Sequence, residues 1–569
     1  MPAPRALSAD PREAARAATR HPYGALLLLC LLLWLPGFFT IPPSDRDESR
    51  FVQGTKQMLE SGNYVEIRNG AEARNRKPIG IYWLQVPFAA AARATGLAAA
   101  NPVWPYRLPS FLGGLLAVFA TFGLWRRTLG DRVALLAAAT LASCVILTVE
   151  AHLAKTDAAL LGVTTCAMGL LARAYLRGRP LLPEQAVAFW LALGAGILLK
   201  GPVTPMVVGL TTLGLAAADR RRGGAGWLRG LRSGWGVPLM LLIVLPWFIA
   251  IGLATHGAFF ADALGGDLAS KVRGGDDAHG ALPGLHLLLL PVLAFPSSLL
   301  LVRALPAAWR DRTAPPTRFL LAWIVPSWIV FECVPTKLPH YTLPLFPALC
   351  LLGAAWALDP VRRPAPRWLE MASAALFAVA AAILGGGAAL LPEVVRPGWA
   401  ASDAIGLPAL AAAALLGWLV LRALPDPRRA LGAGLLALPL LLWSVLGLEL
   451  PDLRGLWLAP QVAAALQAHW SGGRPDDAAF AEIGYAEPSL VFLCGTATGL
   501  LGDPEAAAHF LAGGPDRVLL VGERDLAAFG AASRRLGLSP HAFAVIRGYN
   551  YSRGRRVVLT LFDAPRSAG

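Results

Sequence analysis

Carboxylates and cations gather in short motifs beside long apolar runs. The first motif is Ser44–Arg50, which places Asp47, Glu48 and Arg50 directly after an apolar segment. A carboxylate at the mouth of a membrane cavity can orient an attacking hydroxyl and accept its proton. Arg50 stands one helical turn after Asp47 and would share its helix face. The alternative is that acids in a first helical turn only balance the helix dipole.

Further motifs supply cations and rings. Preorganised Arg and Lys side chains stabilise phosphate charge in a low-dielectric cavity. Each motif also has a plainer interpretation as an interfacial anchor or a polar turn, since Lys and Arg near helix ends extend to the membrane surface. The binding candidates are Arg76, Lys77, Tyr82, Lys200, Lys271, Lys337, His340 and Tyr341. Asp157, in a very short link between two apolar runs, is our second choice after Asp47 for the catalytic carboxylate.

The composition indicates which elements must position these residues. Of 569 residues, 56% are hydrophobic and 15% are charged, whereas soluble domains carry about 25% charged residues. Mean hydropathy is +0.53. Long apolar runs, rather than alternating strands of roughly 10 residues, exclude an outer-membrane barrel. The composition therefore predicts a polytopic α-helical membrane protein.

Thirteen runs are long enough to be spans, given that a bilayer core needs about 20 apolar residues per helix. No small-x-small cleavage site follows the first run, so we expect an uncleaved span and a cytoplasmic N-terminus. The odd number of spans then places the C-terminus outside. The runs are 24–41, 106–125, 133–150, 158–175, 185–199, 203–218, 236–254, 284–302, 318–335, 341–357, 370–391, 404–424 and 431–448.

This topology divides the chain into three parts. We expect a cytoplasmic tail over 1–23, a transmembrane domain over 24–448 and a small periplasmic α/β domain over 449–569. The transmembrane domain includes a first outer loop, 42–105, with helices on the membrane surface. In the C-terminal α/β domain we expect helices at 460–470, 504–511 and 524–536, and strands at 490–494, 517–522, 542–547 and 556–562.

The positive charge follows the same topology. The loops assigned inside are rich in basic residues, as the positive-inside rule predicts, and every one of these residues is Arg. All six Lys fall on the outer side, which indicates a task other than anchoring. The basic residues form no separate basic domain, which argues against nucleic-acid binding. The six cysteines show neither a disulfide framework nor a metal-site spacing.

The motifs together resemble a known family. In their order along the chain they resemble the bacterial lipid A aminoarabinose transferases, close to the protein O-mannosyltransferases. The likeness covers roughly residues 25–500. The residues that carry it are Asp47-Glu48-Ser49-Arg50, Lys77-Pro78, Tyr82-Trp83, Lys155-Thr156-Asp157, Lys200-Gly201-Pro202, His279-Gly280, Lys337-Leu338-Pro339-His340-Tyr341 and Ala486-Glu487-Pro488.

The resemblance implies a C-superfamily glycosyltransferase fold. It also implies a polyprenyl-phosphate sugar donor, and a glycolipid acceptor such as lipid A on the periplasmic face of the bacterial inner membrane. It places Asp47 as the catalytic acidic residue, Arg50 and Lys77 near the donor phosphate, and Tyr82 and Asp157 in the cavity. Relatives often carry Glu before the Lys-Pro pair, implicated in metal binding. Arg76 stands there in this chain, so we expect no metal and no other cofactor.

Two other classes of function remain open. A transporter or lipid flippase could also have thirteen spans with charges at their ends, although transporters place such charges near the midplane and often contain inverted repeats. A non-catalytic scaffold that displays the C-terminal domain is the third possibility. It predicts that changes around Asp47 are silent.

Overall fold

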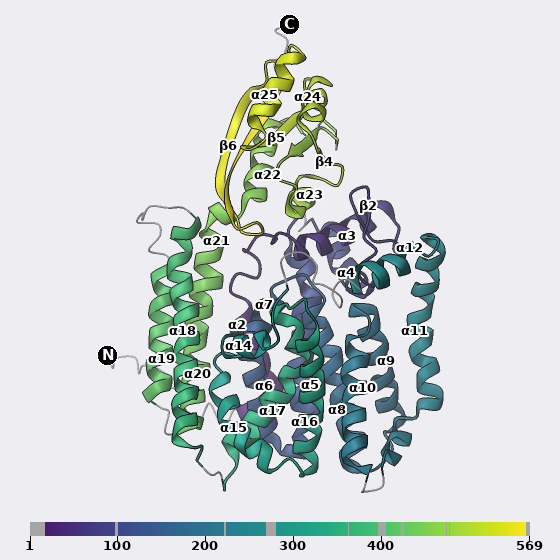
Figure 1. The fold of residues 1–569 in the computed structure, drawn as a ribbon, viewed down its shortest axis with the longest axis vertical. Helices are drawn as coiled ribbons and strands as arrows, with labels where there is room; N and C mark the ends of the chain where they lie inside the picture. Colours follow the sequence, from purple (N-terminus) through teal and green to yellow (C-terminus); the bar gives the residue numbers. More distant parts are fainter. Residues whose placement is uncertain are drawn as a thin grey trace, which may run out of the picture.

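The chain folds into a helical body with an α/β region on top (Figure 1). The computed structural model describes residues 18–96, 101–220, 224–268, 280–361, 364–395, 406–422, 426–473, 475–476 and 478–564. The long elements of the body are α2 (Pro22–Trp34), α5 (Trp104–Leu129), α6 (Asp131–Ser143), α7 (Val145–Ala151), α8 (Asp157–Arg177), α9 (Pro183–Lys200), α10 (Val203–Ala218), α11 (Ser233–Ala254), α14 (Leu285–Leu293), α15 (Ser298–Arg310), α16 (Pro315–Cys333), α17 (Phe346–Leu358), α18 (Arg367–Val395), α19 (Leu407–Arg422) and α20 (Pro427–Leu442).

The remaining elements connect these helices or lie across their upper ends. Two of them, α3 and α4, are the helices expected in the first outer loop. The set comprises α3 (Asp47–Ser61), β1 (Arg68–Asn69), β2 (Glu72–Ala73), α4 (Gly80–Ala94), η2 (Gly226–Leu231), α12 (Ala258–Phe260), η3 (Ala261–Leu268), η4 (Pro339–Leu345), η6 (Trp443–Glu449), α21 (Leu450–Asp452) and η7 (Arg454–Leu456).

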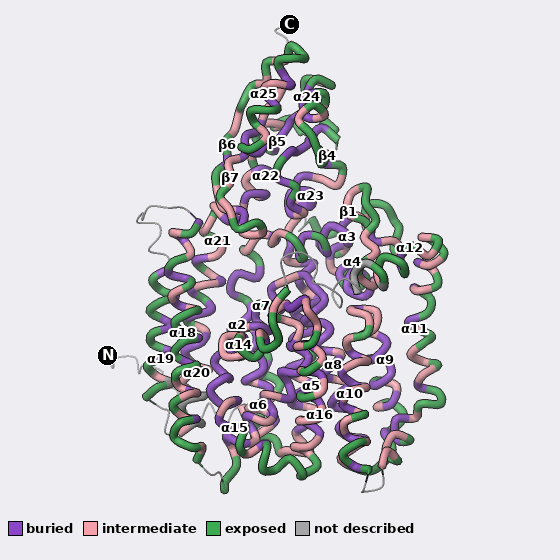
Figure 2. The backbone as a smooth tube through the Cα atoms, viewed as in Figure 1, coloured by how far each residue is buried: buried purple, intermediate pink, exposed green. Residues whose placement is uncertain are grey.

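The apolar sequence explains both faces of the body. The centre is buried, while the outer sides of α11, α18 and α19 are exposed (Figure 2). The exposed surface is itself apolar, with Leu242 and Leu253 on α11 open to the surroundings. Helices that are apolar all round suit a lipid environment. Inside, Gly113 and Gly162 let α5 and α8 touch, since a Cβ on Gly113 would lie 2.4 Å from the Cα of Ala159.

The helical class is confirmed, and the number of crossings is not. Among the described residues each of the thirteen predicted runs overlaps helix, although α2 ends at Trp34 and covers only the first part of the run 24–41. Among the described residues, six helices are long and apolar enough to cross a membrane, or up to eight if each bent pair counts as one span. Several predicted spans are short or broken; α6 and α7, for example, meet at 63°. Thirteen crossings therefore remain a prediction.

The C-terminal region is a small α/β layer structure. Its sheet has the order β4-β3-β5-β7-β6, with parallel pairing around β3 and a long antiparallel hairpin of β6 and β7. The elements are α22 (Leu458–His469), β3 (Phe480–Ile483), α23 (Pro488–Cys494), β4 (Gly499–Leu500), α24 (Pro504–Ala512), β5 (Val518–Gly522), α25 (Leu526–Arg535), β6 (His541–Asn550) and β7 (Arg555–Asp563).

Three predicted helices and three predicted strands of this region are confirmed, but the strand expected at 490–494 is wrong. That segment is helix α23. Pro488 occupies its first helical position, where the fixed φ of proline favours a helix. A five-residue apolar run does not by itself distinguish a buried strand from a short helix. Strands β3 and β4 were not predicted.

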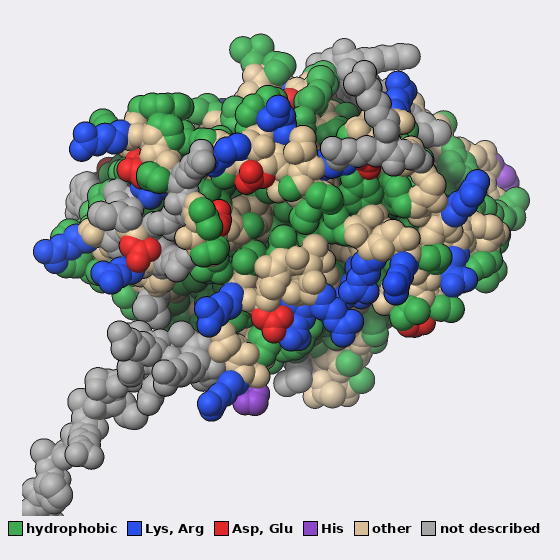
Figure 3. Space-filling model, turned by 90° about the horizontal axis from the view of Figure 1, so that it is seen from below, with side chains coloured by type: hydrophobic (Ala, Val, Ile, Leu, Met, Phe, Trp, Pro, Cys, Tyr) green, Lys and Arg blue, Asp and Glu red, His purple; other side chains and the backbone are tan. Residues whose placement is uncertain are grey.

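Basic side chains are scattered over the face opposite the α/β region. In the view from below, Lys and Arg side chains lie among hydrophobic ones (Figure 3). The structure puts Arg126 and Arg127 in the last turn of α5, Arg177 in that of α8 and Arg310 in that of α15. These ends point away from the α/β region (Figure 1).

Candidate active site

A cavity of about 530 Å³ opens among the upper ends of the helices. Its charged and polar lining contains six of the predicted site residues: Arg76, Lys77, Asp157, Lys200, His340 and Tyr341. The rest of its wall is largely apolar, with Leu160, Ile197 and Met206 from the helices and Phe248, Phe259 and Phe260 from α11 and α12. The cavity thus combines a cationic portion with a hydrocarbon-like wall.

Asp157 is the centre of an ionic cluster in this cavity. As the first residue of α8 it is 6% exposed. Lys200, the last residue of α9, pairs with its Oδ1. Lys155 Nζ lies 4.0 Å from Oδ2, and His340 Nε2 lies 3.7 Å from Oδ1. Lys200 also lies over the Tyr341 ring, 5.3 Å from its centroid. The ends of three helices thus bring together residues up to 185 positions apart, from Lys155 to His340.

Glu150 completes this cluster and was missed as a site residue. Its Oε1 lies 3.1 Å from Lys155 Nζ and 3.6 Å from His340 Nδ1. Burial opposes the charge on Lys155, but the carboxylates of Glu150 and Asp157 raise the pKa of Lys155 above its ordinary value. The signal in the sequence was a lone carboxylate near the end of an apolar run, where an unpaired charge is costly.

Asp47 stands at the start of α3 and does not line the cavity. Its side chain is 51% exposed, and Arg50 Nη1 lies 4.0 Å from its Oδ1. The predicted pairing of the two residues on one helix face is therefore present. Asp47 is also among the charges that raise the pKa of Lys155. Its field reaches the ionic cluster, and the carboxylate itself remains accessible.

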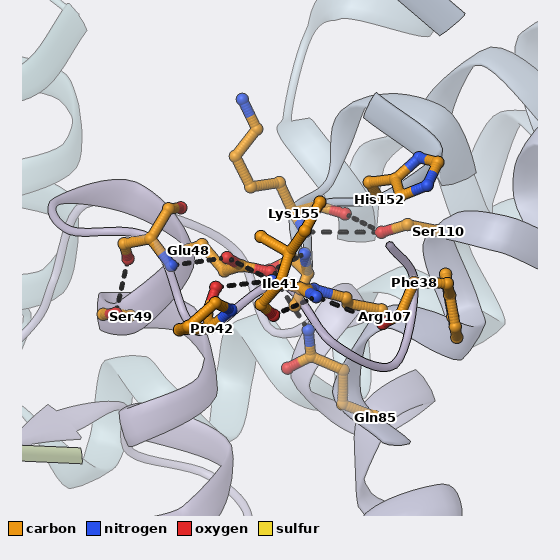
Figure 4. Close-up of polar contacts among 12 residues, drawn as sticks. Phe38, Ile41, Pro42, Glu48, Ser49, Gln85, Arg107, Ser110, His152 and Lys155 are labelled. Atoms are coloured by element: carbon orange, nitrogen blue, oxygen red, sulfur yellow. Dashed lines mark hydrogen bonds and ion pairs between the residues drawn. The ribbon is translucent and has the colours of Figure 1, made fainter. Parts of the chain in front are cut away.

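Glu48 lies apart from the cavity in a buried ion pair with Arg107 on α5 (Figure 4). Arg107 donates to both carboxylate oxygens, at 2.8 and 3.1 Å, and to the carbonyls of Phe38, Ile41 and Pro42. Glu48 also accepts from the backbone N–H groups of Ser44 and Ala154. Although burial alone would raise it, Arg107 holds the pKa of Glu48 below its ordinary value.

This network changes the interpretation of Glu48. Its carboxylate holds α3, α5 and the link before α8 together, and it does not face the cavity that a substrate would enter. We therefore assign it to positioning the loop rather than to binding substrate. Arg107 was not predicted; the only signal was one Arg in the first turns of an apolar run.

Tyr82 is likewise a packing residue. It is fully buried, and its ring lies 5.5 Å from that of Phe51 on α3. A Cβ on Gly54 would lie 2.7 Å from the same ring, so α3 and α4 pack closely there. Burial raises the pKa of Tyr82. The side chain is not among the cavity lining and instead sets the distance between the two helices.

Lys337 holds a neighbouring loop. Its ammonium group donates to the carbonyls of Ala281 and Val334, both at 2.8 Å, and the side chain is buried. It therefore ties the segment before α14 to the end of α16 and does not line the cavity. Lys271 and His279 lie outside the described residues.

The charged set in the cavity does not fit a divalent metal. Hard cations need several free oxygen ligands, but the Asp157 carboxylate already faces Lys155 and Lys200. Arg76 and Lys77 add two further positive charges to the same lining.

Known proteins resemble this chain in sequence and in fold. The model of the dolichyl-phosphate-mannose-protein mannosyltransferase family matches residues 46–258, which hold Asp47, Lys77, Asp157 and Lys200. An undecaprenyl phosphate-alpha-4-amino-4-deoxy-L-arabinose arabinosyl transferase of Pectobacterium carotovorum is 26% identical over 451 residues, 75% of each chain.

The similarity in fold extends over nearly the whole chain. The crystal structure of ArnT from Cupriavidus metallidurans in the apo state has a TM-score of 0.67 and 21% identity, covering 96% of this chain and 98% of that one. The structure of ArnT bound to undecaprenyl phosphate has the same TM-score at 20% identity, covering 95% and 98%. The resemblance seen in the motifs is thus confirmed: the chain is similar in sequence to aminoarabinose transferases and has the fold of the ArnT structures.

Proposed function

We propose that this protein is a membrane glycosyltransferase that moves a sugar from a polyprenyl-phosphate donor to an envelope glycolipid such as lipid A, with inversion. The observation that carries the proposal is the cavity, which pairs Arg76, Lys77 and Lys200 with an apolar wall. A lipid phosphate needs both, since its headgroup is anionic and its tail is hydrocarbon. The relatives named as arabinosyl transferases support this donor class.

The proposed sugar transfer needs no general acid. The leaving group is a phosphate ester, already a weak base, so the protein mainly has to stabilise its growing negative charge. Lys77, Arg76 and Lys200 supply positive charge in a largely apolar cavity, where it acts strongly. In this scheme Asp157 fixes the lysines and orients the donor.

Asp47 is our candidate for activating the acceptor. An exposed carboxylate can orient an acceptor hydroxyl and take its proton late in the transfer, a contribution of ~10²–10⁴-fold. If the acceptor atom belongs to a phosphate, deprotonation is unnecessary and Asp47 positions it. Either role involves one displacement at the anomeric carbon, which inverts the configuration.

We place the site at the periplasmic face of the inner membrane. The cavity lies at the helix ends nearest the α/β region, whereas the Arg-rich ends lie opposite. Under the positive-inside rule the Arg-rich face is cytoplasmic. The N-terminus would then be cytoplasmic and the α/β region periplasmic, which agrees with thirteen crossings.

The test is release of free polyprenyl phosphate by the purified full chain in lipid nanodiscs. We would supply a panel of undecaprenyl-phosphate sugars with and without extracted envelope lipids. One donor should give release that rises with acceptor lipid and is lost in Asp47→Asn. The matched control is Asp131→Asn, an exposed carboxylate at the opposite face. Ion-coupled uptake into sealed proteoliposomes, without sugar-dependent release, would favour a transporter instead.

A further inference from the structure

The segment that leads into α3 is held by residues of the α/β region. The backbone N–H of Asp45 donates to the Tyr551 hydroxyl, and Ser489 donates its hydroxyl to the Asp45 carboxylate. The Arg46 guanidinium donates to the Ser552 carbonyl. These contacts join positions that are 444 to 506 residues apart, immediately before Asp47.

The backbone conformation of this segment would be unfavourable without these contacts. Arg46 has φ 64° and ψ −110°, a region that non-glycine residues rarely occupy. Such a conformation persists only when its surroundings impose it. Here Ser489, Tyr551 and Ser552 hold the turn from the side of the α/β region. From the side of the helical body, the Glu48 carboxylate, paired with Arg107, accepts from the Ser44 N–H at 2.8 Å.

The contact continues along α3. Gln53 Nε2 donates to Thr496 Oγ1 at 2.9 Å, and Lys56 Nζ donates to the Phe492 carbonyl at 2.9 Å. Thr496 Oγ1 donates in turn to Glu60 at 2.7 Å. The first four turns of the helix that begins with Asp47 therefore rest on α23 and the loop after it.

The hairpin that supplies Tyr551 is itself ordered locally. Glu487 is buried, and its Oε1 accepts from Asn550 Nδ2 at 2.8 Å and from Ser552 Oγ at 2.5 Å. Glu487 directly precedes α23, which carries Ser489. One carboxylate thus joins the two elements that grip Asp45.

We propose that the α/β region sets the position of Asp47, and that Ser489 and Tyr551 are positioning residues for sugar transfer. The inference rests on the proposed function in that Asp47 acts on the acceptor. Among the described residues, Ser489 and Tyr551 are not part of the cavity lining; they hydrogen-bond to Asp45 and so fix the turn from which Asp47 projects. A misplacement of about 1 Å can cost 10²-fold in rate.

The variants Ser489→Ala and Tyr551→Phe remove the two hydroxyl groups, alone and together, from the full chain in nanodiscs. The controls are Ser533→Ala and Tyr549→Phe. Ser533 is a buried hydroxyl in the same region that has no hydrogen-bond partner among the described residues, and Tyr549 lies on the same hairpin. We expect kcat to fall about ten- to a hundred-fold in the double variant, with the KM for donor unchanged. Ser489→Thr, which keeps the hydroxyl, should restore kcat.

A second measurement needs no reaction. It tests the clamp, by which we mean the hydrogen bonds of Ser489, Tyr551 and Ser552 with Asp45 and Arg46. Amide hydrogen exchange over residues 44–50 should speed up in the double variant and stay at the wild-type rate in both controls. Unchanged exchange and unchanged kcat would overturn the proposal, as would a kcat loss matched by an equal loss of donor affinity. If the wild type releases no polyprenyl phosphate, the proposed function fails while the exchange result still decides the clamp.

Discussion

The Asp157 carboxylate forms ion pairs with both Lys200 and Lys155. Two positive charges therefore balance its negative charge in a largely apolar cavity. Such a group is poorly suited to accept a proton, because two ammonium groups stabilise its charged form. It is well suited to fix the lysines at a phosphate. Asp47, half-exposed and paired only loosely with Arg50, keeps its acceptor capacity. The two predicted catalytic carboxylates therefore suit different tasks.

Lys200→Gln should weaken donor binding more than it slows a bound complex. A hydrogen bond to a charged group contributes ~1.5–3 kcal/mol, so we expect donor affinity to fall ~10–100-fold. Binding of undecaprenyl phosphate to nanodisc-held protein measures this directly. Arg310→Gln, an exposed cation at the opposite end, is the control. Equal affinities of Lys200→Gln and wild type would remove Lys200 from the phosphate site.

Asp45 should make stability depend on pH. Burial raises its pKa to about 7; Ser489 and Arg46 oppose the rise, and Glu487 adds to it. An unfolded Asp has a pKa of about 3.9, so the folded state favours the protonated form. The free energy of unfolding should therefore fall as pH rises from about 4 to about 7. Thermal unfolding of Asp45→Asn between these pH values should show a smaller fall than wild type. Glu482, whose pKa burial also raises to about 7, contributes with the same sign and is tested by Glu482→Gln.

At the scale of elements, one buried ion pair fixes the entry to α3. The Arg107 side chain from α5 gathers Glu48 and three carbonyls of the link between α2 and α3, and Glu48 reaches the link before α8 through Ala154 (Figure 4). This arrangement puts the start of α3 and the start of α8 in fixed relation. Those two positions carry Asp47 and Asp157.

Breaking that pair should destabilise the protein. Removing one partner of a buried ion pair costs ~3–5 kcal/mol, because the other charge stays buried without compensation. We expect Glu48→Gln to lower the unfolding temperature clearly in nanodiscs. Asp131→Asn, which breaks the exposed pair with Arg126, should change it little. If both variants unfolded at the wild-type temperature, the pair would not hold the fold.

At the scale of the whole molecule, charge is segregated between two ends. Arg-rich helix ends lie on one face, and the α/β region lies at the other (Figure 1). The cavity lining includes the first residue of α8 and the last residue of α9, which are the helix ends opposite the Arg-rich face. In the proposed function, this polarity would let a donor lipid in the bilayer present its phosphate to a site beside a water-exposed region. The same polarity predicts the orientation in the membrane.

Reporter fusions test that orientation. Alkaline phosphatase fused after Asp563 should be active, because the enzyme matures only in an oxidising compartment outside the cytoplasm. Fused after Gly224, between α10 and α11, it should be inactive, and a fluorescent protein there should be bright. The opposite pattern would reverse the topology and place the cavity on the cytoplasmic side.

The sequence by itself determined the helical membrane class and the likeness to the aminoarabinose transferases, because these depend on local composition and on the order of motifs. Asp157, Lys200 and His340 could be predicted as neighbours in function from their places at helix ends. Only the tertiary structure decided that Glu48 pairs with Arg107, that Tyr82 is a packing residue and that Glu150 belongs to the ionic cluster. The physical reason is that burial and pairing depend on segments far apart in the chain, as in the contacts of Asp45 with Ser489 and Tyr551. No local pattern around Asp45 contains its partners.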